Sequence, residues 1–286
     1  MNYRMIFRTL GGVLVCLAAL MLLPLAVGLC YGENVLGFAV AIAATAAISL
    51  LLRRIKPRST DIYAREGFAI VGLAWICMSL LGALPFVISG DIPNYIDAVF
   101  ETVSGFTTTG ASILANVEEM SHAGLFWRSF THWLGGMGVL VFVMAVLPMS
   151  GDHSMHIMRA EVPGPTVGKL VPRAKKTAKI LYLMYMALTA VETVLLLLGG
   201  MSFFDALLHA FGTAGTGGFS TKAASVGAYD SVYVEMVISV FMLLFSVNFN
   251  LYYLLLIGRL RDVLKNEELH WFLGIVCFAV LTIAVN

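Results

Sequence analysis

The sequence predicts an all-α integral membrane protein in which a span–pore-hairpin–span unit is repeated. Three observations support this prediction: scarce charge, a series of long apolar segments, and a duplicated short segment rich in glycine and threonine. Of the 286 residues, 59% are hydrophobic and only 12% are charged. A soluble globular domain carries about 25% charged residues. So few charged side chains cannot cover the surface of a soluble protein of this size.

Seven apolar segments are long enough to cross the membrane as helices. An α-helix needs about 20 apolar residues to cross a hydrocarbon layer of ~30 Å. The first segment is too long for the apolar core of a signal peptide and has no clear cleavage site after it, so we expect it to remain as a span. The approximate bounds of the segments are 5–29, 35–52, 67–89, 126–148, 178–200, 232–257 and 269–285.

The basic residues predict the topology. Four basic groups flank the segments, and the order of the segments requires all four to lie on one side of the membrane. Because loops rich in Lys and Arg stay in the cytoplasm, we expect a multi-pass plasma-membrane protein with its N terminus inside. Only Arg128 and Lys222 fall on the outer side. The other 16 of the 18 basic residues are Arg4 and Arg8; Arg53, Arg54, Lys56, Arg58 and Arg65; Arg159, Lys169, Arg173, Lys175, Lys176 and Lys179; and Arg259, Arg261 and Lys265.

Two further apolar segments, at about 97–106 and 205–213, are too short to span the membrane. Each lies in a loop that the charge pattern places outside, so we expect each to dip into the membrane as a half-helix and return to the same side. A crossing at either segment would put the basic groups on opposite sides. Asp97 and Asp205 open the two segments and are candidate helix N-caps.

The two short segments belong to a duplicated unit. The first reads DAVFETVSGFTTTGAS from Asp97 to Ser112, and the second reads DALLHAFGTAGTGGFS from Asp205 to Ser220. The aspartates are 108 residues apart but the Thr-Gly pairs are 107 apart, which predicts a one-residue slip inside the hairpin. Both units are entered from the basic side, so an axis along the membrane normal relates them, as in a pore.

The duplication organises the chain into consecutive parts. Residues 1–56 form two N-terminal spans, 65–150 the first unit, and 151–174 a cytoplasmic connector. Residues 175–261 form the second unit. Residues 268–286 are expected to open a third unit.

The glycine- and threonine-rich loops predict a path for a dehydrated cation. Inward-facing backbone carbonyls can replace the water shell of such an ion, and Gly allows the backbone angles that this requires. The C-terminal ends of the half-helices would point into the membrane with partial negative charge, which favours a cation. The candidate filter residues are Thr108, Thr109, Gly110 and Ala111 in the first loop, and Gly215, Thr216, Gly217 and Gly218 in the second.

Other polar residues leave alternatives open. Glu192 lies within an apolar span, where a carboxylate is either functional or a hydrogen-bonded structural group. We expect His209 to pack behind the second loop, at the place that Glu101 occupies in the first. An intramembrane enzyme using Glu192 or a histidine is the rival function, but no paired catalytic spacing supports it. The outer acids form either a cation-attracting vestibule or solvated loop charges: Asp91, Asp97, Glu101, Glu118, Glu119, Asp205, Asp230 and Glu235.

Several motifs together resemble the Trk/Ktr/HKT superfamily of potassium and sodium transporters, and in particular its bacterial Trk branch. They are SGFTTTGAS, FWRSFTHWLGGMGVLVFVMAVLP, VPGP…LVPRAKK, FGTAGTGGFSTK and NFNLYYLLLIGR, in this order. The resemblance implies a K⁺-uptake subunit of a bacterial inner membrane, with four units around a central pore. Each unit would contribute one filter glycine, here Gly110 and Gly217, and K⁺ would bind at the eight filter positions.

The resemblance also implies partners. Members of the superfamily act as homodimers in lipid with a cytoplasmic nucleotide-binding regulatory subunit, and need neither a cofactor nor a nucleic acid. This chain holds only two of the four expected units and the start of a third. We expect a truncated product rather than two chains that assemble one pore. A truncated, non-conducting remnant is therefore the main alternative to a conducting subunit.

Overall fold

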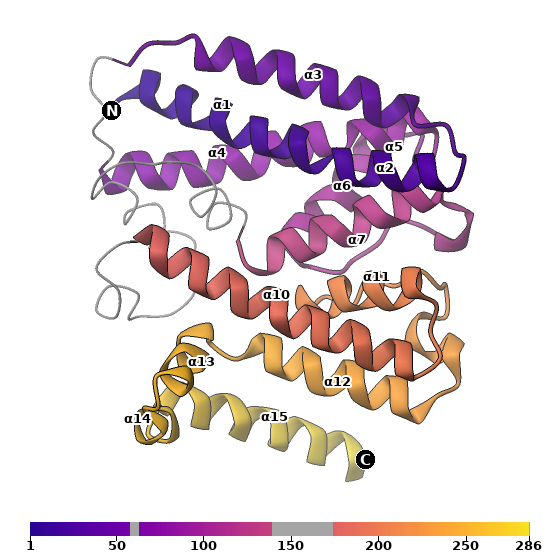
Figure 1. The fold of residues 1–286 in the computed structure, drawn as a ribbon, viewed down its shortest axis with the longest axis vertical. Helices are drawn as coiled ribbons and strands as arrows, with labels where there is room; N and C mark the ends of the chain where they lie inside the picture. The colour runs from indigo at the N-terminus through magenta and orange to yellow at the C-terminus, as the bar shows by residue number, and fades with distance from the viewer. Residues whose placement is uncertain (58–62, 139–173, 286) are drawn as a thin grey trace.

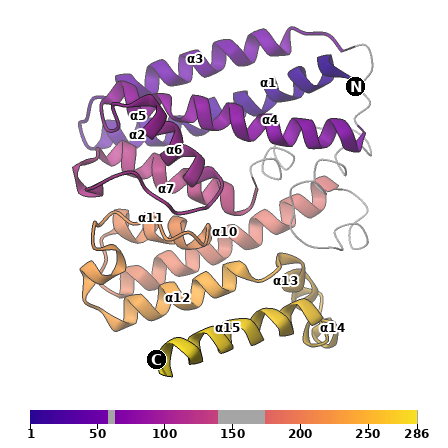
Figure 2. The same ribbon diagram turned by 180° about the vertical axis from the view of Figure 1, so that it is seen from behind.

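A computed structural model of the chain describes residues 1–57, 63–138 and 174–285, and these residues form helices joined by short turns (Figure 1). The long helices run side by side, and the loops between them gather at the two ends of the bundle (Figures 1 and 2). Within the described residues the fold is all-α, as predicted.

Five helical segments are long and apolar enough to cross a membrane, and each matches a predicted span. Two of them contain a break. α1 (Tyr3–Leu20) continues as α2 (Leu22–Cys30), and α4 (Ala64–Gly82) continues as α5 (Leu84–Ser89). A proline near the start of α2 and of α5 lacks the N–H that an unbroken helix would use. The five segments are Tyr3–Cys30, Leu36–Arg53, Arg65–Ser89, Lys179–Leu198 and Glu267–Val285.

The predicted span at 232–257 is not one straight helix. α12 (Val232–Ser246) and α13 (Phe249–Leu256) meet at an angle of 87°. The side chain of Asn248 accepts a hydrogen bond from the N–H of Asn250 and so caps a new helix at the bend. Hydropathy alone cannot register this bend, because both arms are apolar.

The predicted span at 126–148 is described only in part. Its described portion belongs to α7 (His122–Gly136), and the rest, like the connector at 151–174 apart from its last residue, lies outside the described residues. α7 packs against both half-helices, α6 (Tyr95–Phe106) and α11 (Phe203–Ala214). It therefore lies between the two half-helices, as Figures 1 and 2 show.

Buried hydrogen bonds fix α7 against its neighbours. Trp127 is fully buried, and its indole N–H donates to the carbonyl oxygen of Gly82 on α4 at 2.8 Å. The hydroxyl of Tyr185, on α10 (Ala174–Leu198), donates to the carbonyl oxygen of Trp133 at 2.9 Å. α7 is thereby tied to the first span of each unit.

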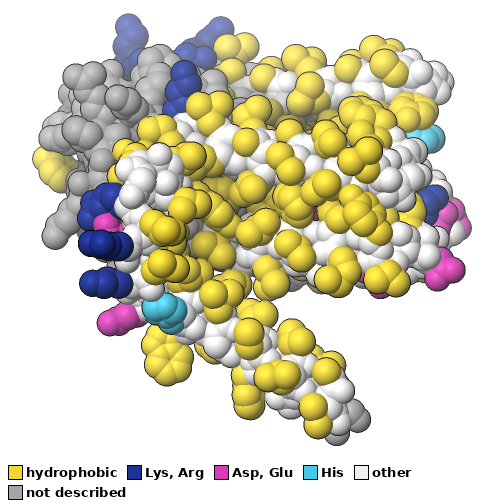
Figure 3. All heavy atoms as spheres, turned by 60° about the horizontal axis from the view of Figure 1, so that its bottom comes forward, with side chains coloured by type: hydrophobic (Ala, Val, Ile, Leu, Met, Phe, Trp, Pro, Cys, Tyr) yellow, Lys and Arg dark blue, Asp and Glu magenta, His cyan; other side chains and the backbone are white. Residues whose placement is uncertain are grey.

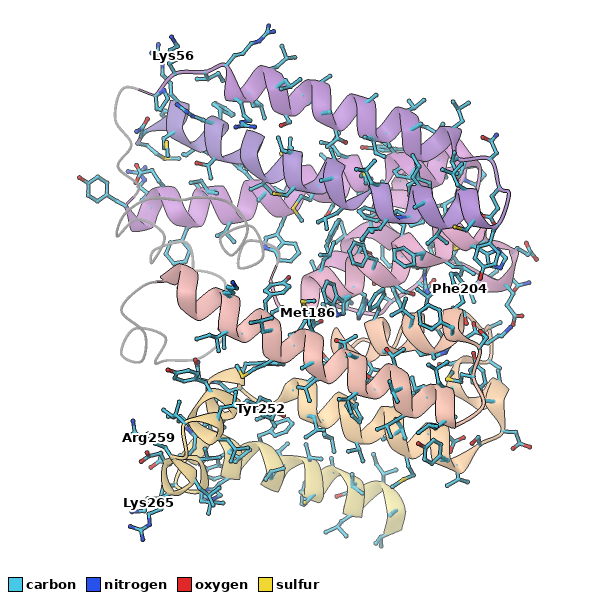
Figure 4. The ribbon with its side chains drawn as sticks, in the orientation of Figure 1. Lys56, Met186, Phe204, Tyr252, Arg259 and Lys265 are labelled. Carbon is cyan, nitrogen blue, oxygen red and sulfur yellow. The ribbon has the colours of Figure 1, made fainter. Side chains whose placement is uncertain are left out.

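The two ends of the bundle differ in charge. Basic side chains gather at one end and a band of hydrophobic side chains crosses the middle (Figure 3). Lys56, Arg259 and Lys265 lie at the basic end, and Phe204, at the start of α11, lies at the other (Figure 4). This grouping agrees with the predicted topology, in which both hairpins enter and leave at the end opposite the basic groups.

Hydrogen bonds join the loops at the hairpin end. Glu33, between α2 and α3 (Leu36–Arg53), accepts from the backbone N–H of His122 at 2.8 Å and of Ala123 at 3.1 Å. The N–H of Ser121 donates to Asp91 at 2.9 Å. The start of α7 is therefore anchored to two other loops. The turns η1 (Val117–Glu119) and η2 (Ser225–Tyr229) belong to the segments that follow the two half-helices.

The last helices lie at the edge of the bundle. α14 (Leu260–Leu264) is a short turn at the basic end, and α15 (Glu267–Val285) follows it with no buried residue (Figure 1). The amide of Asn248 donates to the carboxylate of Glu268 at 3.2 Å and holds the start of α15 near the bend. The apolar surface of α15 is therefore free to meet lipid or another helix.

Candidate ion-binding site

The two half-helices are equivalent along their whole length. α6 and α11 each have 12 residues, and their bounds differ by a constant 108 positions. The expected N-caps are wrong: Asn94 and Ser202 cap the helices, and Asp97 and Asp205 lie in the first turns. Asp97 and Asp205 still stabilise the two helices, because a carboxylate near a helix N terminus interacts favourably with the positive end of the helix dipole.

The loops that follow the half-helices have the same backbone course. Thr108 and Thr216 have φ values of 55° and 59°, and Gly110 and Gly218 have φ values of 75° and 76°. A left-handed φ is strained for a β-branched residue, and such strain is concentrated at functional sites. Two threonines that share this rare conformation at matched positions indicate one loop design used twice.

The predicted one-residue slip is therefore wrong. The constant offset of 108 carries through the loops, so Gly218 is the equivalent of Gly110, and Gly217 stands where the first loop has Thr109. The two turns also share hydrogen bonds: the N–H of Thr108 donates to Gly105, and the N–H of Thr216 donates to Thr213. The false match arose because Gly217, which stands in the place of Thr109, forms a Thr-Gly pair with Thr216 one position before the equivalent of Gly110.

The loops touch each other. A Cβ added to Gly110 would collide with the carbonyl oxygen of Gly217, and a Cβ added to Gly217 would lie 2.9 Å from the carbonyl oxygen of Thr108. Of the eight candidate residues only Gly215 is buried, and the others are half-buried or exposed. The structure thus brings the two sets of candidates together and leaves backbone and side chains of both accessible.

Glu101 is buried behind the first loop and does not belong to an outer vestibule, which corrects that expectation. It is 1% exposed, and its carboxylate accepts from the hydroxyl of Ser112 at 3.0 Å and from the N–H of Ile113 at 2.9 Å. In the second unit, Nε2 of His209 lies 2.9 Å from the hydroxyl of Ser220. His209 therefore packs behind its loop, as predicted, and each unit joins its half-helix to the serine that follows its loop.

Arg128 of α7 links the two units, a role that its sequence position did not reveal. It is 4% exposed, and its Nε lies 2.5 Å from Glu101. Its Nη1 donates to the carbonyl oxygen of Ser220 at 3.1 Å, and its guanidinium carbon lies 3.6 Å from the centre of the Phe219 ring. The one available signal was an arginine set in an apolar run, which implies a buried partner.

His132, one helical turn after Arg128, packs against the second loop. It is fully buried, its ring centre lies 4.5 Å from that of Phe219, and its nitrogens have no hydrogen-bond partner among the described residues. A Cβ on Gly215 or Gly217 would collide with the His132 ring. Both glycines are therefore required by the close approach of this ring.

Glu192 stands apart from the loops. It is fully buried on α10 beside Thr213, and its oxygens have no hydrogen bond of good geometry within the described residues. Among all the residues that the structure describes, no three His, Cys, Asp or Glu side chains are grouped to hold a metal ion. Glu192 has no catalytic partner there that would support the rival enzyme hypothesis.

Comparison with known proteins gives consistent matches. Residues 33–285 match the family described as TrkH, cation transport protein. The Trk system potassium uptake protein TrkH of Salmonella typhimurium is 39% identical over 284 residues, which cover 96% of this chain and 58% of that protein. TrkH of Vibrio parahaemolyticus is 40% identical over 261 residues, covering 88% and 53%. This chain therefore spans somewhat more than half the length of these relatives.

The fold is also similar to a solved structure. The crystal structure of the potassium transporter TrkH from Vibrio parahaemolyticus superposes with a TM-score of 0.75 at 35% sequence identity. The match covers 88% of this chain and 52% of that one.

Proposed function

The chain belongs to the family of TrkH cation transport proteins, and on this premise we propose that it supplies two adjoining quarters of a carbonyl-lined filter for K⁺ uptake. The observation that carries the proposal is the pair of equivalent loops, each with a left-handed threonine and glycine, in direct contact behind two half-helices. An ordinary external loop rich in Gly and Thr would not be expected to occur twice with the same strained backbone.

The proposed path works without covalent chemistry. A K⁺ ion entering from the hairpin end exchanges water for backbone oxygens of Thr108, Thr109, Gly110 and Ala111 in the first loop. In the second loop the ion binds backbone oxygens of Thr216, Gly217 and Gly218. Gly215 is buried and lies at the end of the half-helix. Both half-helices end directly before the loops, so the negative ends of their dipoles favour a cation there.

The wider setting is part of the proposal. The chain is a multi-pass protein of a bacterial inner membrane, and its basic end, with the N terminus, faces the cytoplasm. The complete filter requires two further units, and the working assembly is a homodimer with a cytoplasmic nucleotide-binding regulatory subunit. The alternative, a non-conducting remnant, differs in one measurable property, which is ion uptake.

The decisive experiment is rescue of growth at low K⁺ in a host that lacks its own K⁺ uptake, using the complete reading frame that contains this chain. We expect the parent to restore growth, and Gly110→Ser and Gly218→Ser to abolish it at equal abundance in the membrane. Rescue that survives both substitutions would remove the filter from the proposal. Failure of the parent itself would favour the remnant.

A further inference from the structure

The buried Arg128 side chain contacts Glu101 of the first half-helix and, at the same time, Phe219 and Ser220, which directly follow the second filter loop. Its Nε pairs with Glu101, which holds the residues after the first loop, and its Nη1 donates to Ser220, two residues after Gly218. We propose that Arg128 positions the second loop against the first and thereby sets the preference for K⁺ over Na⁺, an inference that rests on the proposed function. Arg128 is a positioning residue, since it acts through the loops and does not touch the ion.

The second unit shows that a loop can be held without an ion pair. There the side-chain partner of the serine after the loop is His209, and the α12 residues at offsets of 108 and 110 from Arg128 are Met236 and Ile238, which are both apolar. Holding a serine therefore does not require the charges of Glu101 and Arg128. What the arginine adds is its reach into the other unit.

A buried ion pair is weak as a source of stability. Replacement of such pairs by apolar residues is often neutral or stabilising, so their retention points to a specific geometry. The planar guanidinium suits this place because it presents an N–H to the carboxylate, another to a carbonyl, and its face to an aromatic ring. A lysine offers one compact charge and cannot make the three contacts together.

Phe219 is fixed from both sides, which makes the contact with Arg128 effective. The guanidinium lies over its ring, and its backbone oxygen lies so close to Gly212 of α11 that a Cβ on that glycine would collide with it. Phe219 directly follows the left-handed Gly218. The position of the Gly218 carbonyl therefore depends on the contacts that Arg128 and α11 make with Phe219.

The test measures ion preference separately from folding, in the complete reading frame. Arg128→Lys retains the charge beside Glu101 but loses the contacts with Ser220 and Phe219. The double variant Glu101→His with Arg128→Met copies the second unit, and Arg128→Met alone leaves Glu101 without its partner. Lys222→Met is the matched control, because Lys222 pairs with Glu118 at 3.6 Å between the segments that follow the same two loops but is only half-buried.

Each variant is assayed for abundance in the membrane and for inhibition of Rb⁺ uptake by K⁺ and by Na⁺. We expect Arg128→Lys to be as abundant as the parent while its preference for K⁺ over Na⁺ falls about tenfold, which corresponds to ~1.4 kcal/mol. We expect the double variant to regain the abundance that Arg128→Met loses, but not the preference. Lys222→Met should match the parent in both measurements.

Two results would overturn the inference. One is an Arg128→Lys protein with the ion preference of the parent. The other is a double variant that recovers abundance and preference together, since Arg128 would then serve only to neutralise Glu101. A parent without K⁺ uptake is a different failure, which removes the proposed function and the inference with it.

Discussion

The carbonyl oxygen of Gly217 occupies the space that a side chain on Gly110 would need. The two glycines belong to different units, 107 positions apart, yet their loops meet at backbone distance. This contact defines how closely two quarters of the proposed filter approach each other.

Substitution of Gly110 by alanine should therefore abolish transport. The new Cβ meets the backbone of Gly217, and the left-handed φ of 75° adds strain of about 1–2 kcal/mol. Gly200→Ala is the matched control, because Gly200 has a φ of 89° with nothing within 4 Å of its Cβ position. Rb⁺ uptake per transporter should be lost in the first variant and retained in the second. Equal losses in both would show that strain alone is responsible.

The His132 ring predicts a rescue. Gly217→Ala should impair transport, because its Cβ would overlap the ring of His132. His132→Ala removes the ring, so the double variant should regain part of the activity that the single glycine variant loses, a coupling that contacting residues show. The measurement is a double-mutant cycle on uptake rate at equal abundance. Additive losses would mean that the ring is not what excludes a side chain at position 217.

Loss of the Glu101 carboxylate should be costly to stability. Glu101→Gln leaves the buried Arg128 charge without its partner, and breaking one side of a buried pair costs about 3–5 kcal/mol. Glu118→Gln removes an exposed partner of Lys222, for which about 0–1 kcal/mol is expected. Thermal unfolding of the purified proteins in detergent compares the two. A Glu101→Gln midpoint equal to that of Glu118→Gln would contradict the assignment of Glu101 as a buried ion-pair partner.

Glu33 should make the hairpin end sensitive to acid. Partial burial acts to raise the pKa of Glu33, but hydrogen bonds from the N–H groups of His122 and Ala123 and from the His122 ring outweigh it and lower the pKa below 4.5. The folded state thus binds this proton less readily than the unfolded state. The contribution of the Glu33 carboxylate to folding stability is full above pH 4.5. It is lost as the pH falls through the lower pKa that Glu33 has in the folded state.

Glu33→Gln is the variant that isolates this effect. The difference in unfolding midpoint between the parent and Glu33→Gln should be largest near neutral pH and should shrink as the pH falls below 4.5. His122→Asn keeps the backbone donors while removing the imidazole, so it separates the two contributions. A midpoint difference that is constant over this range would exclude Glu33 as the titrating group.

Most of the fold could be predicted because the bilayer restricts what a sequence can do. Long apolar segments must be helices, and the uneven placement of Lys and Arg forces the two short segments to return to the side they entered. The bend after Ser246 escaped prediction, since hydropathy does not report the direction of a helix. It depends on the cap that Asn248 provides.

The assignment of the candidate site to the two loops stays a prediction, but its alignment and its support could not be predicted from the sequence. The residues of both loops were identified from glycine and threonine, whereas the equivalence of Gly110 with Gly218 depends on backbone angles that letters do not encode. The partnership of Glu101 with Arg128 joins positions 27 apart, and the contact with Ser220 joins positions 92 apart. Such distant pairs follow from the packing of α7 between the half-helices.

The different supports behind the two loops have an evolutionary consequence. One unit uses a carboxylate behind its loop and the other an imidazole, and the carboxylate is paired with an arginine from another helix. Neither Glu101 nor Arg128 can be replaced singly by an uncharged residue without leaving an unpaired buried charge, so loss of one charge is expected to be accompanied by loss of the other. Across homologues positions 101 and 128 should covary, while position 209 should vary independently of the α12 residues that correspond to Arg128.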